Sequence, residues 1–418
     1  MTVTETVAPA PAAVVPLRRN WRFQLIWAGS TASFLGVEAA DVAYPLAILA
    51  LTGSPVQAAA FGVVQLLATL LCGLPAGDYA DRHDSRRLLL LAEGVRAAAT
   101  GSVAVVFILT GHASLLHFLV AAAALGAAQP FGGTARMLLV REVVPPAQLT
   151  AALTQEQVRN GLGALAGPPL GGTLYGLKAL RHGLPFVFSA ATFLISLACA
   201  FFVRVPTKPA EPAVAAEREP TLRRMFAGVR NLWDDPALRA ATVLAMAINT
   251  VGAPLVLVTV VLLRAQGVSP ALTGLALAGS AVGGLAGALL VKPLHRLQPG
   301  VLLIGFAFLV VPALALLAVP LGPWWVAGLL LTVSLGIPAL EVLVDVLILR
   351  RVPAEQRGRT IGAVMTLFTL GMPVGTVYAG LLLEYLSPSA ALLVLAGTMA
   401  VAAVSCAKPE LRAARWPA

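Results

Sequence analysis

Residues 77–87 read Gly-Asp-Tyr-Ala-Asp-Arg-His-Asp-Ser-Arg-Arg. This polar stretch separates two apolar segments, at 56–77 and 88–110, each long enough to cross a lipid bilayer as a helix. Its glycine lets two helices approach closely. Its acidic and basic side chains can form a charge network at the membrane surface. The stretch therefore predicts a tight cytoplasmic loop between two transmembrane helices.

Apolar segments of this kind recur along the whole chain. Of 418 residues, 58% are hydrophobic and 11% are charged, whereas a soluble domain has about 25% charged residues. Because backbone groups in lipid need partners within their own segment, we expect helices rather than strands. Twelve transmembrane helices are predicted, at 23–50, 56–77, 88–110, 113–140, 149–177, 183–203, 238–263, 270–292, 299–319, 323–349, 358–383 and 387–406.

Basic residues gather in alternate loops. The loops on one side hold most of them, and the opposite loops hold little beyond Lys178, Arg181 and Arg264. This bias predicts that both termini lie in the cytoplasm. The net charge of +10 is spread over these loops and forms no single patch, so we expect the lipid bilayer and not nucleic acid as a partner.

The longest polar stretch, near the middle of the chain, divides it in two. Leu222, Met225, Val229 and Trp233 fall there at helical spacing, which is typical of an amphipathic helix on the inner leaflet; a plain charged linker is the alternative. We expect a disordered cytoplasmic tail at 1–22, six-helix bundles at 23–203 and 238–406, a linker at 204–237 and a cytoplasmic tail at 407–418.

Two short patterns recur in both halves. Gly-x-Pro-x-Gly at 167–171 returns at 371–375, and Val-Pro at 144–145 returns at 352–353. In each case the copies lie roughly half a chain length apart and occupy equivalent helix or loop positions. The order of the two patterns indicates a parallel duplication of six plus six helices.

Ionisable side chains inside apolar spans are costly unless they face a cavity or a partner, so each is a functional candidate. In the first span, Glu38, Asp41 and Tyr44 follow one another on one helical face. We interpret them as candidates for binding a proton or a cationic substrate. The alternative is a wetted structural pair of acids near the outer interface.

Glu341 and Asp345 lie one helical turn apart in the tenth span. Two carboxylates this close repel each other when both are charged, which favours proton uptake by one of them. We interpret them as further candidates for proton coupling or substrate binding. The alternative is a structural network with Arg136 or Arg159.

Other polar residues within the spans are interpreted more simply. Glu93 with Arg96, and Glu156 with Arg159, are spaced as neutralising pairs on one helix. Polar side chains that can line a cavity or join two helices are Gln65, Gln129, Asn249 and Thr250.

The pattern G-x-x-A-D-R-x-x-x-R-R at 77–87 resembles the signature loop of the major facilitator superfamily. Two positions depart from it: Asp84 stands where the family has a later glycine, and Ser85 replaces the first residue of the closing basic pair. The resemblance implies that Asp81 faces the start of the eleventh helix and helps to latch the outward-facing state. The cytoplasmic gate that it implies consists of Gly77, Asp81, Arg82, Arg86 and Arg87.

The fifth predicted helix is similar to the antiporter motif of major facilitator exporters. Small residues let helices pack backbone to backbone, and proline bends a helix. An upstream glycine of the full pattern is replaced by Thr154, and a generic packing face is the alternative interpretation. The motif residues are Gly163, Gly167, Pro168, Gly171 and Gly172.

Further stretches, at 51–55, 228–236 and 352–359, resemble the drug:proton antiporter branch that includes macrolide-efflux and siderophore (enterobactin) exporters. The resemblance covers nearly the whole chain. The fourth-helix arginine of many drug antiporters falls near Ala122, where this chain has none. No G-x-x-x-x-G-K-[ST] nucleotide motif occurs, so we expect an ion gradient to supply the energy.

These observations predict an all-α polytopic membrane protein with the major facilitator fold, in which two pseudo-symmetric six-helix bundles enclose a central cavity. We expect a monomeric secondary transporter in the bacterial inner membrane that exports small amphiphilic or cationic compounds in exchange for protons or another cation. No enzymatic activity, cofactor or metal is expected. The alternatives are a dedicated siderophore or natural-product exporter, a proton symporter, and a lipid transporter or membrane sensor.

Overall fold

The computed structural model describes residues 16–177, 179–203, 233, 235–294, 299–338 and 354–407. Within these ranges the chain is helical and contains no strand. The long helices are α1 (Trp21–Thr52), α2 (Pro55–Arg82), α3 (Ser85–Thr110), α4 (Leu115–Val143), α5 (Leu149–Gly176), α6 (Leu184–Phe202), α8 (Pro236–Gly252), α9 (Leu255–Ala265), α10 (Pro270–Leu294), α11 (Pro299–Leu317), α12 (Pro323–Ser334), α14 (Ala354–Tyr385) and α15 (Pro388–Cys406). Short 3-10 turns lie at Leu17–Arg19, Pro146–Gln148 and Ala179–His182.

Eleven of the twelve predicted spans fall on helix that the structure describes, and the tenth, 323–349, is described only as far as residue 338. Nine helical stretches there are long and apolar enough to cross a membrane, and two shorter apolar helices lie at Ile304–Leu317 and Pro323–Ser334. The protein is therefore an all-α polytopic membrane protein. The bundle boundaries given above remain predictions, and the amphipathic helix, most of the linker and most of both tails lie outside the described residues.

The seventh predicted span, 238–263, is not one continuous helix. The chain turns between α8 and α9, and Pro254 is the residue directly before α9. Proline has no backbone N–H to donate, so an unbroken helix through this position would lose a hydrogen bond and suffer a steric clash. The two helices together still form one apolar stretch, Leu238–Ala265.

Helix ends follow local capping chemistry. The side chains of Ser54, Asp84 and Ser114 each accept a hydrogen bond from a backbone N–H in the first turn of α2, α3 and α4. Gly53 and Gly111 end α1 and α3 in the left-handed conformation, with φ of 68° and 82°. The loops joining these helices are consequently short.

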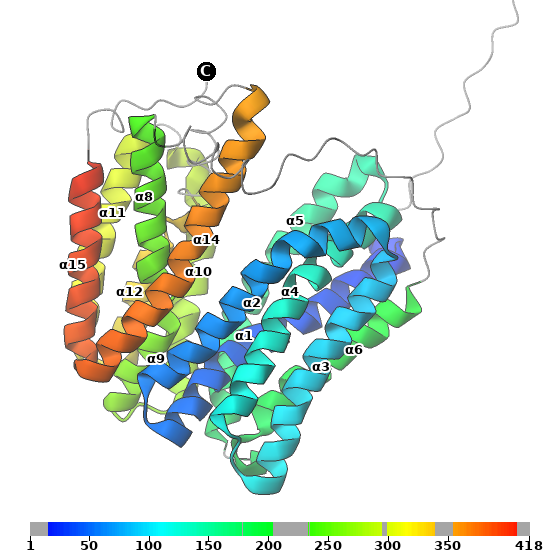
Figure 1. Ribbon diagram of the computed structural model, residues 1–418, viewed down its shortest axis with the longest axis horizontal. Helices are drawn as coiled ribbons and strands as arrows, with labels where there is room; N and C mark the ends of the chain where they lie inside the picture. Colours follow the sequence, from blue (N-terminus) through cyan, green and yellow to red (C-terminus); the bar gives the residue numbers. More distant parts are fainter. Residues whose placement is uncertain are drawn as a thin grey trace, which may run out of the picture.

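Helices α1–α6 form one half of the molecule and α8–α15 the other (Figure 1). Two antiparallel helix pairs join the halves, α2 with α14 and α5 with α10. In the α2–α14 seam, Gly62 lies against Thr376, and Gly380 lies against Ala59. These contacts are close to the end of α2 that carries Ser54, which we call the far end. The first and last described helices, α1 and α15, begin and end, respectively, at the opposite end, which we call the terminal end (Figure 1).

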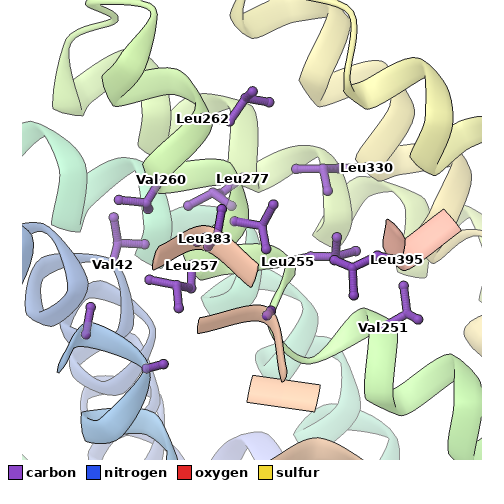
Figure 2. Packing of buried hydrophobic residues seen from close by; sticks show 14 of the residues in the cluster. Val42, Val251, Leu255, Leu257, Val260, Leu262, Leu277, Leu330, Leu383 and Leu395 are labelled. Atoms are coloured by element: carbon purple, nitrogen blue, oxygen red, sulfur yellow. The ribbon is translucent and has the colours of Figure 1, made fainter. Parts of the chain in front are cut away.

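One apolar cluster closes the far end. It contains buried residues of both halves, and Figure 2 shows Val42 of α1 beside Leu257 and Val260 of α9. A second cluster, around Phe23 and Leu139, contains only residues of the first half and lies toward the chain termini. The halves therefore share a core at the far end and have separate packing toward the terminal end.

The α2–α14 seam opens toward the terminal end. Gly73 and Gly77 lie on the same face of α2 as Gly62, three and four turns further along. Among the described residues, no atom comes within 4 Å of a Cβ placed on either glycine. The two helices diverge in this direction in Figure 1. Among the described residues, the halves are therefore in contact at the far end of this seam and apart toward its terminal end.

Candidate functional site

The predicted motif on α5 packs directly on the part of α1 that carries the acids. A Cβ added to Gly163, Gly167 or Gly171 would come within 3 Å of Phe34, Glu38 or Ala39, respectively. These glycines are spaced by one turn, so they form a stripe without side chains along α5. The contact with Ala39 is to its backbone, so α1 and α5 touch almost backbone to backbone beside Glu38.

The second half repeats this arrangement. Gly371 and Gly375 of α14 pack on α8, where a Cβ on Gly375 would meet the backbone of Thr250. Gly371 lies against the Cβ of Asn249, as Gly167 lies against the Cβ of Glu38. The recurring Gly-x-Pro-x-Gly pattern thus performs the same packing role twice. Glu38 and Asn249 occupy equivalent positions in the two halves.

The neighbouring face of α5 forms the seam with α10. A Cβ on Gly172 would touch the carbonyl oxygen of Pro270, and one on Gly274 would touch the carbonyl oxygen of Pro168. Leu285 of α10 contacts Gly161 further along the same seam. Helix α5 therefore lies between the acid-bearing helix of its own half and a helix of the other half.

Asp41 lines a small pocket inside the first half. Its neighbours there include Tyr44 of α1, Gln65 of α2, Arg96 of α3 and Gln129 of α4. The free volume is about 10 Å³, close to the smallest space that holds one water molecule. Among the described residues, the Asp41 carboxylate makes no hydrogen bond or ion pair. The pocket suits a proton or a water molecule and is too small for an organic substrate.

Tyr44 forms the far wall of this pocket. It is buried, its ring stacks on Phe61 with centroids 4.2 Å apart, and its hydroxyl lies 3.4 Å from the hydroxyl of Thr100. Phe118 and Phe186 surround the same ring. The Tyr44 ring therefore fills the space between the Asp41 pocket and the far end with apolar contacts.

Glu93 of α3 is the centre of a buried charge cluster beside the pocket. Its carboxylate accepts hydrogen bonds from the Ser33 hydroxyl at 3.0 and 3.1 Å and from Arg136 Nη2 of α4 at 2.9 Å. Arg96 Nη1 donates to Ser33 Oγ at 3.3 Å and lies 3.9 Å from Glu93 Oε1. One carboxylate thus serves two guanidinium groups.

The pair Glu93–Arg96 exists, but it is the weaker part of the cluster. Helical spacing suggested that these residues neutralise each other, whereas the shortest ion pair of Glu93 is with Arg136. The Nε atoms of both arginines are buried and have no hydrogen-bond partner in the described part of the molecule. Arg96, which also lines the Asp41 pocket, therefore retains hydrogen-bonding capacity.

The second helical pair, Glu156–Arg159, has an ion pair of 2.9 Å as its spacing predicted. Arg159 also donates to the side-chain oxygen of Asn160. Glu341 and Asp345 lie outside the described residues, so the structure gives no placement for them. Of the described candidates, Asp41 and Tyr44 share one pocket, and Glu38 faces α5 instead.

The predicted gate residues lie at the terminal end of α2 and α3. Arg82 forms an exposed ion pair with Asp78 at 3.3 Å. Arg86 donates to the carbonyl oxygens of Ala200 and Phe201 and so fastens α3 to the last turn of α6. Described residues make no close approach to Gly77, and the side chain of Asp81 is outside the described set.

The two departures from the signature loop have local structural roles. Asp84 accepts a hydrogen bond from the backbone N–H of Arg87 at 2.8 Å and is the N-cap of α3. Ser85 donates to the carboxylate of Glu142 at the end of α4. These side chains hold the loop in place where the family pattern has a glycine and a basic residue.

The model of the major facilitator superfamily matches residues 26–376. The chain belongs to the major facilitator superfamily. Its fold is therefore that of two pseudo-symmetric six-helix bundles, and it is a multi-pass membrane transporter for small molecules. The family and the fold are those of transporters and not of enzymes.

Related sequences and structures agree with this assignment. The chain is 26% identical to the multidrug efflux pump Tap of Mycolicibacterium fortuitum over 355 residues, which cover 81% of this chain and 83% of Tap. It is 24% identical to the MFS-type transporter YfiS of Bacillus subtilis over 393 residues, 91% of each chain. The nucleoside transporter NupG superposes with a TM-score of 0.74 at 12% identity, covering 92% of this chain and 98% of NupG.

A bacterial homologue of the lysosomal transporter Spinster, in an inward-facing and occupied conformation, superposes with a TM-score of 0.71 at 15% identity. The match covers 94% of this chain and 97% of the homologue. At this identity the likeness concerns the fold alone.

Proposed function

We propose that this major facilitator protein exports small amphiphilic or cationic compounds from the bacterial cytoplasm in exchange for protons. The observation that carries the proposal is the packing of α5. Its glycine stripe holds the segment of α1 with Glu38 and Asp41, and its adjacent face forms the seam with α10. A change of charge on α1 therefore reaches the boundary between the halves through a single helix.

In this proposal, Asp41 is the proton-binding group. The pocket around it has room for about one water molecule, and Arg96 on its wall offers an unpartnered Nε. When Asp41 is ionised, Arg96 is attracted to it. When Asp41 is protonated, Arg96 is held by Ser33 and Glu93 alone. Proton binding thus exchanges one charge pairing for another without leaving a bare buried charge.

Glu38 and Asn249 are the proposed substrate contacts. They occupy equivalent positions in the two halves, and Glu38 has no hydrogen bond or ion pair among the described residues. The amide nitrogen of Asn249 is buried without a hydrogen-bond partner in that same part of the chain. A carboxylate attracts an ammonium group, and an amide donates to a carbonyl or hydroxyl. The pair therefore favours a cationic compound that also bears an acceptor.

The direction of transport follows from the proposed orientation. If the basic loops place both termini in the cytoplasm, the terminal end is the cytoplasmic one, and the conformation described above is inward-open. Substrate then enters from the cytoplasm. The 26% identity to a multidrug efflux pump is a further observation that supports export.

Proton movement in energised inside-out vesicles tests the proposal. We expect at least one compound from a panel of cationic antibiotics, dyes and siderophores to collapse the pH gradient only in vesicles that contain the protein. Asp41→Asn should abolish this response. Asp235→Asn is the matched control, because an asparagine can replace the N-cap of α8 that Asp235 provides.

Two results would contradict the proposal. One is a wild-type protein that moves no protons with any compound of the panel, while it transports one of them. The other is an Asp41→Asn variant with the full proton response. Glu38→Gln should raise the concentration of a cationic compound needed for half-maximal response and leave that of a neutral compound unchanged.

A further inference from the structure

The far end of the α2–α14 seam carries a polar contact that no part of the proposed coupling uses. The Ser54 hydroxyl donates to Glu384 Oε2 at 2.7 Å, and the backbone N–H of Val56 lies 3.3 Å from the same oxygen. Ser54 is the N-cap of α2, and Glu384 is the next-to-last residue of α14. A carboxylate of one half thus caps a helix of the other half.

This placement is electrostatically favourable only across the seam. The C-terminal end of a helix carries a partial negative charge, so the position of Glu384 on its own helix is unfavourable. The N-terminal end of α2 carries a partial positive charge and has free backbone N–H groups. The gain from facing α2 therefore exists only while the far end is closed.

The contact continues a regular antiparallel register. Going from the far end inward, Ser54 meets Glu384, Ala59 meets Gly380, and Gly62 meets Thr376. If the same register is extended along both helices, Asp81 falls opposite the first turn of α14, near residue 357. Each helix of the pair thus has an acid close to its C-terminal end, opposite the N-terminal end of its partner.

At the far end of the α5–α10 seam, the described residues include no such acid. At its far end, Ser269 caps α10, and the facing residue of α5 is Gly176, whose Cβ position lies 3.8 Å from Ala271 N. Glycine contacts in this seam continue inward to Gly161 and Leu285. In the part of the chain that the structure describes, the α2–α14 seam alone has a carboxylate on a partner helix cap.

We propose that Glu384 is a gating residue that stabilises the conformation closed at the far end. It does so by capping the N-terminus of α2 with its carboxylate. When the far end opens, the contact with Ser54 and Val56 is lost. The resemblance of residues 77–87 to the family's signature loop implies the corresponding role for Asp81, at the opposite end of α2. The two acids bias the same equilibrium in opposite directions.

Distance measurement between spin labels tests the role of Glu384 without any substrate. Labels are attached to cysteines at Leu116 and Leu321, which are exposed and lie near the far end on different halves. The background has Cys72, Cys199 and Cys406 replaced by alanine. Since no transport is measured, failure of this experiment is independent of failure of the proposed export function.

We expect Glu384→Ala and Ser54→Ala each to raise the population with a long label-to-label distance, roughly threefold to tenfold, as for the loss of an exposed charge-assisted hydrogen bond. Ser387→Ala is the matched control. It removes an N-cap of the same type from α15, and that cap has no role in the seam. Its distance distribution should match that of the wild type.

Glu384→Asp should lie between the wild type and Glu384→Ala. Asp81→Asn should shift the population the other way. Folding of each variant is checked by its thermal unfolding. A folded Glu384→Ala protein with the wild-type distance distribution would overturn the proposal, as would an equal shift in Ser387→Ala.

Discussion

Replacing Glu93 with glutamine tests the energetic picture of the buried charge cluster. Glu93 is fully buried. Its Oε1 atom lies 2.9 Å from Arg136 Nη2 and 3.9 Å from Arg96 Nη1, and the two arginines come from different helices. The substitution keeps the shape of the side chain and removes its charge. Two buried guanidinium groups then remain beside a neutral amide.

The expected magnitude follows from burial. Breaking a buried ion pair by removing one partner costs about 3–5 kcal/mol, because the remaining charge is left uncompensated. An exposed pair contributes about 0–1 kcal/mol. The Arg82–Asp78 pair provides that comparison, since its side chains are 63% and 44% exposed. We therefore expect a large fall in melting temperature for Glu93→Gln and almost none for Arg82→Gln.

Thermal unfolding of the purified proteins in detergent, followed by tryptophan fluorescence, provides the measurement. A second variant separates charge from packing: adding Arg136→Met to Glu93→Gln removes the surplus cation and should restore much of the lost stability. Melting temperatures of Glu93→Gln and Arg82→Gln that agree within error would refute the reasoning. So would a double variant less stable than Glu93→Gln alone.

Three further predictions concern single positions and are checked by the same unfolding measurement. Gly171→Ala should lower the free energy of unfolding by about 1–3 kcal/mol, because its Cβ meets the backbone of Ala39. Gly133→Ala, with open space around it, should raise that free energy by up to about 1 kcal/mol. Equal effects would contradict the close packing of α1 and α5. Tyr44→Phe should lower the free energy of unfolding by at most about 1 kcal/mol, because the hydroxyl contact is long. Tyr44→Ala should lower it by about 3–5 kcal/mol, because a cavity is left beside Phe61. Similar losses would show that the hydroxyl matters more than the ring. Asp84→Ala should lower the free energy of unfolding by about 1 kcal/mol, and Asp84→Gly by only a few tenths of a kcal/mol. A larger loss for the glycine variant would refute the assignment of Asp84 as the N-cap of α3.

The arrangement of spans was predictable because it depends on properties that a sequence states directly. Length and apolarity determine which segments cross the bilayer, and eleven of the twelve predicted segments fall on described helix, while the tenth is described only in part. The contact between the glycine stripe of α5 and a neighbouring helix was predictable in the same way. Glycines at one-turn intervals indicate that another helix packs closely, but they do not show which helix it is. The break at Pro254 was missed because the apolar pattern continues across it.

The side-chain cluster was harder to predict because its members come from separate helices. Helical spacing joined Glu93 to Arg96, but the shorter ion pair is with Arg136, which is distant in sequence. The hydrogen bond between Ser54 and Glu384 was missed for the same reason. Glu384 lies at a helix end, where an acid looks like an ordinary solvated residue, and only the packing of α14 on α2 gives it a partner.

The two seams between the halves have different chemistry, and this difference constrains how the halves can move. At the α5–α10 seam, backbone meets backbone at Gly172 and Gly274, and such contacts leave no side chains to rearrange. The α2–α14 seam ends instead in a hydrogen-bonded carboxylate, whose energy changes sharply when the helices separate. Because α5 is also packed tightly on α1, a charge change at Asp41 cannot be absorbed by sliding these two helices apart. In the transport cycle that we propose, the halves therefore rock about the α5–α10 contact, and the far end opens at the α2–α14 seam.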